Sequence, residues 1–370
     1  MKKVFFLLLI ALLLPAGTAE ASDECSYTIT KDIKYGDGVI QEGNDTITVP
    51  LYLDVYLPTN CKNGSDKLPI PIGQVHGGGF LHGSRSSGVE NKIRFAEAGY
   101  AVFAIDYRLM EKNKKPVIES LSEDAVEAFV AEFTEEGGRP EQTYGALVAL
   151  EDTIKAKEFV QKQFAGKIDT RWFIQGGSAG AFTAINMAYL ADYVFDKKES
   201  PIGIIEISGG IPENKQHMSR GDANILIIHG TTDTTVPYKM SDRLVSQATA
   251  VNIPYQRITA IGSGHGLAGD GVYDWKVKET GLTVFEHVTR FIDLSLSCRE
   301  TVTPECRKSR NMTELTTSNP KKDAAGINNK KMVSDTEVGP SNNINIKPGY
   351  YVKESIGAMF AKIKHLFSFN

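Results

Sequence analysis

A glycine-rich turn between an apolar run and a helical pattern is the feature that most constrains this chain. Trp172–Ile174 is bounded by glycines and predicts a short buried strand, and Ala181–Leu190 is apolar at helical spacing. Between them lies Gly176-Gly-Ser-Ala-Gly180, which fits the pattern G-x-S-x-G. A turn this tight pushes Ser178 towards an unfavourable conformation, and glycines avoid clashes with the strand and the helix. The stretch is a candidate nucleophile elbow, which exposes the Ser178 hydroxyl at a helix N-terminus.

Strands and helices alternate along most of the chain. Tyr27–Thr30 and Ile47–Leu57 alternate polar and apolar residues, as half-exposed antiparallel strands do. Continuous apolar runs predict buried strands at Ile72–Val75, Ala101–Ile105, Ile202–Ile207, Ile225–Ile228 and Tyr255–Ile261. Helical spacing predicts helices at Ile93–Ala98, Leu147–Phe164 and Leu282–Leu294, and another from about Lys239. This order predicts an α/β fold with about eight strands in a mostly parallel sheet and helices on both faces.

The first 21 residues have the pattern of a secretory signal peptide. Lys2 and Lys3 precede the apolar run Val4–Leu14, and Ala19-Glu-Ala21 follows. The apolar run is too short to span a bilayer. We therefore expect cleavage after Ala21 and a secreted protein, extracellular or periplasmic.

The mature chain is expected to hold one catalytic domain, residues 22–298, followed by two further segments. Within the domain, residues 109–145 carry their own helical pattern and predict an insertion that borders the active site and influences substrate choice. Residues 299–349 are polar and without periodicity, which predicts a disordered linker.

The last segment, residues 350–370, predicts an amphipathic helix. Its apolar residues recur at three- and four-residue intervals, and three lysines against one glutamate give it a net charge of +2. Such a helix can lie on an anionic membrane surface. Docking on the catalytic domain or pairing with another chain would bury the same stripe.

The net charge and the cysteines indicate which ligands and cross-links this chain can have. The formal net charge of −4 argues against a nucleic-acid surface. The four cysteines allow three pairings, of which Cys25–Cys61 and Cys298–Cys306 join neighbours in sequence. No C-x-x-C spacing indicates a metal site, and no cofactor is expected.

A serine hydroxyl becomes a good nucleophile only when a base takes its proton. The chain has seven histidines, and their positions in the sequence indicate which one is the candidate base. His265 stands among glycines directly after the last predicted strand, whereas His229 follows a buried strand and more plausibly supports a loop. Asp233, in the loop after the strand ending at Ile228, is the expected carboxylate partner of His265, and Glu206 is a second candidate. Asp106 is interpreted as a structural partner of Arg108.

Developing negative charge on the substrate needs hydrogen-bond donors. The backbone N–H of Ala179, directly after Ser178, supplies one. Gly78 and Gly79, in the stretch His76-Gly-Gly-Gly79, are the other expected donors, because backbone without side chains can approach a substrate closely.

Together these segments resemble the α/β-hydrolase superfamily over about residues 39–296. The resemblance rests on His76-Gly-Gly-Gly-Phe80, Asp106-Tyr-Arg108, Gly176-Gly-Ser-Ala-Gly180, the Asp233 segment and Gly264-His-Gly266. Within the superfamily it is nearest to serine carboxylesterases of the hormone-sensitive-lipase and feruloyl or acetyl-xylan-esterase type. It implies Ser178 as nucleophile, His265 as base, Asp233 as its partner, and a small-molecule, lipid or polysaccharide ester as substrate.

Two departures from that type leave the substrate undefined. The insertion at residues 109–145 follows the Asp-Tyr-Arg motif, and N-terminal cap helices are missing. Two other functions share this core. A serine peptidase of the prolyl-oligopeptidase type has the same order of catalytic residues, and a catalytically silent binding module can have the same fold.

Overall fold

The computed structural model describes residues 25–61, 67–134, 138–195, 200–211, 218–300 and 313–321. The predicted signal peptide and the predicted amphipathic segment 350–370 lie outside these residues. Among the helices described, none is both long enough and apolar enough to cross a membrane.

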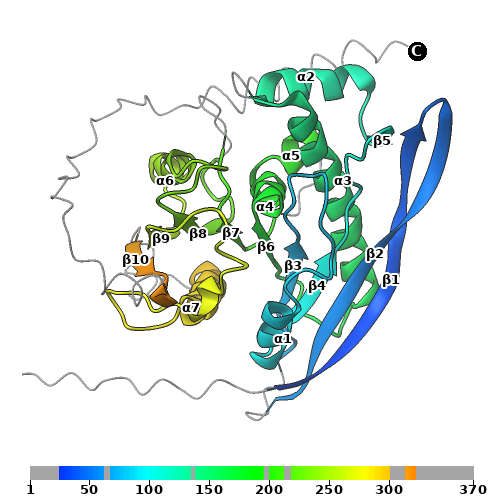
Figure 1. Cartoon of the computed structure of the whole chain (residues 1–370). Coiled ribbons are helices and arrows are strands. Elements are labelled where there is room, and N and C mark those ends of the chain that lie inside the picture. The colour runs from blue at the N-terminus through cyan, green and yellow to red at the C-terminus, as the bar shows by residue number, and fades with distance from the viewer. Residues whose placement is uncertain are drawn as a thin grey trace, which may run out of the picture.

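One sheet of ten strands runs through the described part of the molecule, in the order β10-β9-β8-β7-β6-β3-β4-β2-β1-β5 (Figure 1). Neighbours from β10 to β4 are parallel, and β2, β1 and β5 complete the sheet with antiparallel pairs. The strands are β1 (Cys25–Glu42), β2 (Asp45–Cys61), β3 (Pro71–Val75), β4 (Ala101–Ile105), β5 (Lys114–Val117), β6 (Phe173–Gly177), β7 (Gly203–Ile207), β8 (Asn224–Gly230), β9 (Tyr255–Ile261) and β10 (Thr313–Ser318).

Helices cover both faces of the sheet. They are α1 (Val89–Glu97), α2 (Glu123–Phe133), α3 (Pro140–Gln163), α4 (Ala179–Tyr189), α5 (Ala191–Val194), α6 (Lys239–Val251) and α7 (Val284–Glu300), with a 3₁₀ turn η1 (Val272–Asp274). Consecutive residues of a strand point to opposite faces. On β7, Ile204 packs into the core that contains α3, α4 and α6, and Ile205 packs into the core of α1 and α7. The expected α/β class, a mostly parallel sheet with helices on both faces, is confirmed.

The strand count is higher than the eight expected, because two edge strands escaped prediction. β5 lies in the insertion and pairs with the end of β1. β10 lies in the segment expected to be a disordered linker, and it pairs in parallel with β9 over its whole length. For Thr313–Ser318 that expectation is therefore wrong, because backbone pairing with β9 stabilises a polar segment that has no periodicity of its own.

Parallel strands end at the same edge of a sheet, and this edge gathers the candidate catalytic residues. The glycine loop follows β3, Ser178 follows β6, Asp233 follows β8 and His265 follows β9. The predicted disulfide Cys25–Cys61 is present, and it joins the first residue of β1 to the last residue of β2. The predicted Cys298–Cys306 pairing falls outside the described side chains.

Each residue of the Asp106-Tyr107-Arg108 stretch has a different partner. The Asp106 carboxylate pairs with Arg85, and the Tyr107 ring stacks on His76 with 4.3 Å between ring centroids. The expected pairing of Asp106 with Arg108 is wrong. The buried Arg108 guanidinium instead contacts two carboxylates of α3, with its Nη2 atom 2.8 Å from Asp152 Oδ1.

Arg108 also joins the insertion to the sheet. Its Nη1 donates to the carbonyl oxygens of Val39 in β1 (2.9 Å) and Val117 in β5 (2.6 Å). Buried charges are tolerated when they are paired and hydrogen-bonded, as here. Burial raises the pKa of Asp152, and the adjacent Arg108 opposes that rise.

Candidate active site

Ser178 sits at a strained elbow between β6 and α4. Its φ of 54° and ψ of −121° lie in a region that side chains rarely adopt. The flanking glycines are sterically required: a Cβ on Gly176 would lie 2.2 Å from the Gly180 carbonyl, and one on Gly180 would lie 2.2 Å from the Val75 oxygen. The Ser178 N–H donates to the Ile207 oxygen (2.9 Å), which fixes the elbow to β7.

The structure brings Ser178, His265 and Asp233 into one hydrogen-bonded chain. Ser178 Oγ lies 2.8 Å from His265 Nε2, and His265 Nδ1 lies 2.8 Å from Asp233 Oδ2. A carboxylate only accepts, so Nδ1 carries the imidazole proton and Nε2 is free to accept the serine proton. The Asp233 side chain is fully buried, whereas the His265 side chain is 25% exposed.

Asp233 is held by its own loop and by a second histidine. Its Oδ1 accepts the N–H groups of Thr235 and Val236, both at 2.9 Å. The buried His229 Nε2 donates to the Val236 oxygen (2.9 Å) and lies 3.5 Å from Asp233 Oδ2. Burial lowers the pKa of His229, which keeps this imidazole neutral. The sequence indicated loop support for His229 but not its position beside Asp233.

The glycine loop after β3 lies against the elbow through Gly77. A Cβ on Gly77 would lie 2.8 Å from the Gly177 oxygen and 3.4 Å from Ser178 Cβ. Gly78 and Gly79 follow with positive φ, and the Gly78 oxygen accepts the N–H groups of the next turn. Ala179 is the first residue of α4, so its N–H is one of the donors that a helix leaves without an internal acceptor. Whether Gly78, Gly79 and Ala179 serve as oxyanion donors stays a prediction.

A cavity of about 370 Å³ opens beside Ser178 and His265. Gly77 lines it, whereas Gly78, Gly79 and Ala179 are not among its lining residues. Its polar lining includes Gln74, Gln175 and Lys92, none of which the sequence singled out. The Lys92 ammonium is buried and donates to the Arg85 oxygen (2.6 Å), and burial lowers its pKa to about 8.

Among its described residues, the insertion supplies none of the lining of this cavity. It supports the glycine loop from behind: the Met110 N–H donates to the Phe80 oxygen (2.8 Å), and a Cβ on Gly145 would lie 2.7 Å from Phe80 Cβ. The expected border with the active site is therefore indirect. The insertion instead forms most of a second cavity, described below.

The competing carboxylate, Glu206, has a different hydrogen-bond partner. It is fully buried, and its Oε2 accepts the Gly209 N–H at 2.7 Å. Burial, with a smaller contribution from the charge of Asp233, raises its pKa to about 8, although the Gly209 hydrogen bond and Arg257 oppose the rise. His265 pairs with Asp233 instead.

Three comparisons with known proteins give one partial family match and several similar solved structures. Residues 53–132 match the family model BD-FAE. A search of curated proteins finds no match. Among solved structures, the apo form of esterase 2 from Thermogutta terrifontis is 19% identical, with a TM-score of 0.45, and the alignment covers 67% of this chain and 87% of that one. A truncated carbohydrate esterase from gut microbiota is 16% identical, with a TM-score of 0.42 and coverages of 67% and 92%. The matched residues 53–132 include β3, the glycine loop and α1.

Proposed function

We propose that this protein is a serine esterase that hydrolyses carboxylic esters through an acyl-enzyme on Ser178. The observation that carries the proposal is the chain of two 2.8 Å contacts from Ser178 Oγ through His265 to the buried Asp233, beside a cavity. The BD-FAE match of residues 53–132 supports the same reaction class.

The proposed reaction has two stages, acylation and deacylation of Ser178. His265 Nε2 takes the Ser178 proton as Oγ attacks the ester carbonyl carbon, and Asp233 stabilises the imidazolium that forms. The Ala179 N–H and the glycine-loop N–H groups donate to the resulting oxyanion. Collapse breaks the bond to the alcohol oxygen, which takes the proton from His265. Water then attacks the acyl-enzyme with His265 again as base, which releases the acid and restores Ser178.

The test compares ester and amide substrates. We expect hydrolysis of 4-nitrophenyl acetate and butyrate, and a fall in kcat of at least about 10⁴-fold in Ser178→Ala and in His265→Ala, because triad members act as a unit. Asp233→Asn should cost about 10⁴-fold, since it disturbs the tautomer and orientation of His265.

Ser297→Ala, an exposed serine on α7, is the matched control and should behave as the wild type. A fluorophosphonate probe should add its mass to the wild type and not to Ser178→Ala. Wild-type turnover in Ser178→Ala would sink the proposal. Faster hydrolysis of dipeptide anilides than of esters would favour a peptidase, and no turnover of either would favour a binding module.

We also propose that the protein is exported. The Cys25–Cys61 disulfide supports this, because such bonds persist in oxidising compartments. N-terminal sequencing of the mature protein should begin at Ser22, and an intact Met1 would contradict export by a cleaved signal.

A further inference from the structure

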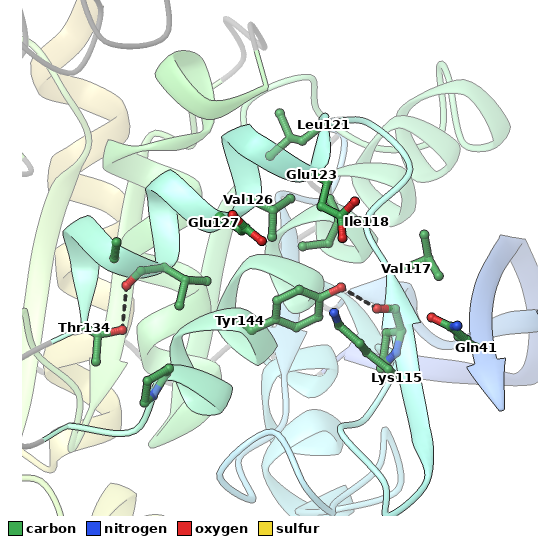
Figure 2. A pocket seen from close by; sticks show the side chains of 14 residues that line it. Gln41, Lys115, Val117, Ile118, Leu121, Glu123, Val126, Glu127, Thr134 and Tyr144 are labelled. Atoms are coloured by element: carbon green, nitrogen blue, oxygen red, sulfur yellow. Dashed lines mark hydrogen bonds between the residues drawn. The ribbon is translucent and has the colours of Figure 1, made fainter. Parts of the chain in front are cut away.

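The insertion forms a cavity larger than the one beside Ser178, about 570 Å³ against 370 Å³. We call it the insertion pocket. It lies between β5 and the segment after it on one side and α2 on the other, with Tyr144 of α3 at its floor (Figure 2). The Tyr144 hydroxyl donates to the Pro116 oxygen (2.6 Å), which holds β5 to α3.

The pocket has apolar walls and a charged rim. The walls include Val117, Leu121, Val126 and Val130, and Figure 2 shows Glu123 and Glu127 of α2 beside them. A concave apolar surface with charged edges suits an amphipathic helix, which buries its apolar face and leaves its charges at the rim.

The charged side chains that line the pocket carry a net negative charge, two glutamates against one lysine. The acidic residues that line the pocket are Glu123 and Glu127. Glu119 pairs with Lys155. Neither Glu123 nor Glu127 has an ion-pair partner among the described residues. The one lysine that lines the pocket, Lys115, lies over the Tyr144 ring, 5.0 Å from its centroid.

We propose that the insertion pocket binds residues 350–370 of the same chain. At helical spacing this segment gathers an apolar stripe on one face: Val352, Ile356, Met359, Phe360, Ile363, Leu366 and Phe367. Lys353, Lys362 and Lys364 give it the charge opposite to that of Glu123 and Glu127, and its single Glu354 has a counterpart in Lys115. The apolar stripe and the charge of the segment are therefore complementary to the pocket.

The chain is long enough to make this contact. The last described residue, Lys321, follows β10 at one edge of the sheet, and the pocket lies beside β5 at the other edge. Nine spacings of about 4.8 Å separate the edge strands by roughly 43 Å. The 28 residues from 322 to 349 span up to roughly 90 Å when extended. An intramolecular partner also acts at a high effective concentration, so a modest contact area is sufficient.

Hydrogen–deuterium exchange of the full mature chain tests the contact. Lys362→Glu/Lys364→Glu should speed exchange of the α2 amides about fivefold, because α2 opens more readily when its partner is lost. Lys330→Glu/Lys331→Glu makes the same charge change outside the segment and is the matched control, with exchange as in the wild type. Adding Glu123→Lys/Glu127→Lys to the first variant reverses the charges of both the segment and the pocket, and it should restore the protection of the α2 amides from exchange.

A zero-length carbodiimide cross-link gives an independent readout. Mass spectrometry should find Lys362 or Lys364 joined to Glu123 or Glu127 within one chain. Equal α2 exchange in all variants, with no such cross-link, would overturn the proposal. Protection that appears only as the protein concentration rises would assign the pocket to a second copy. Co-sedimentation with phosphatidylserine vesicles, together with unprotected α2 amides, would assign the segment to a membrane surface.

Discussion

At the scale of single residues, most side chains of the candidate site act by fixing the orientation of a neighbouring side chain through hydrogen bonds. Asp233 orients His265 and is itself held by two backbone N–H groups, while His229 holds the carbonyl of the same loop. His229 therefore acts on Ser178 only through Asp233 and His265. We consider it a positioning residue, not a catalytic one.

This role predicts a particular pH signature. His229→Phe keeps the aromatic volume and removes the N–H that lies 3.5 Å from Asp233 Oδ2, so the carboxylate charge is less shielded. A less shielded Asp233 stabilises the imidazolium form of His265, and the acid limb of kcat/KM should move to higher pH. We expect kcat/KM at pH 8 to fall by roughly tenfold, because the loop also loses alignment.

His229→Gln is the conservative variant, because its amide can still donate to the Val236 oxygen. It should recover most of the activity and return the acid limb to its wild-type position. Thermal unfolding of both variants checks that they are folded. An unchanged pH profile in a less active His229→Phe would indicate a purely structural role.

The sequence predicted catalytic candidates better than their supports. Ser178, Asp233 and His265 were found because their chemistry requires particular residue types at strand ends, which leaves few options. The partner of Asp106 was predicted wrongly, because Arg108 is two residues away in the sequence, whereas Arg85 is 21 residues away and reaches Asp106 only in the folded chain. Gln74 lies in the predicted strand Ile72–Val75 and Lys92 lies just before the predicted helix Ile93–Ala98, so nothing local marked them as cavity lining.

At the scale of elements, eight of the ten described strands could be predicted from the pattern of their apolar residues, whereas β5 and β10 could not. β5 is four residues long with two lysines and a proline, which is typical of an edge strand. β10 is a run of threonine, serine and glutamate with one leucine. Both are stabilised by pairing with strands distant in sequence, and this information is absent from any local window.

The close contact between α4 and the end of β3 predicts how adding a methyl group at Gly180 changes stability and activity. Gly180→Ala would place a Cβ 2.2 Å from the backbone oxygen of Val75 and 2.9 Å from that of His76. Val75 is the last residue of β3, and His76 is the first residue of the glycine loop. The higher helix propensity of alanine, about 1 kcal/mol, offsets part of an overpacking cost of about 1–3 kcal/mol. Stability should therefore fall modestly.

Activity should fall further than stability. The clash moves the elbow relative to the glycine loop, and a misplacement of about 1 Å can cost about a hundredfold in rate. Gly36→Ala is the control, since its Cβ would meet nothing within 4 Å and its φ is not positive. Ester kinetics and thermal unfolding measured on both variants check the prediction. Full activity in Gly180→Ala would show that the elbow tolerates a wider separation.

At the scale of the whole molecule, buried titratable groups set how stability depends on pH. Burial lowers the pKa values of His76, His229 and His287. The unfolded chain then binds more protons than the folded chain as pH falls through about 6.5, so these histidines cost stability on the acid side. Glu206 acts in the opposite direction, because burial raises its pKa from 4.5 to about 8.

Glu206 therefore predicts a loss of stability on the alkaline side. The unfolded chain releases the Glu206 proton near pH 4.5, whereas the folded chain holds it to about pH 8. The contribution of Glu206 is complete below pH 4.5 and is lost as pH rises, with a slope of up to about 1.4 kcal/mol per pH unit. Glu206→Gln cannot ionise, and its amide oxygen can still accept the Gly209 N–H.

The variant should match the wild type near pH 5 and be more stable at pH 8, with a melting temperature higher by roughly ten degrees, at about 2–4 °C per kcal/mol for a domain of this size. Glu97→Gln replaces an exposed glutamate on α1 and should show no such divergence. Calorimetric melting from pH 5 to pH 9 measures all three proteins. A constant difference between Glu206→Gln and the wild type across this range would mean that Glu206 is ionised in the folded protein. Asp233 and Glu206 would then carry two negative charges close together in the core beneath the elbow.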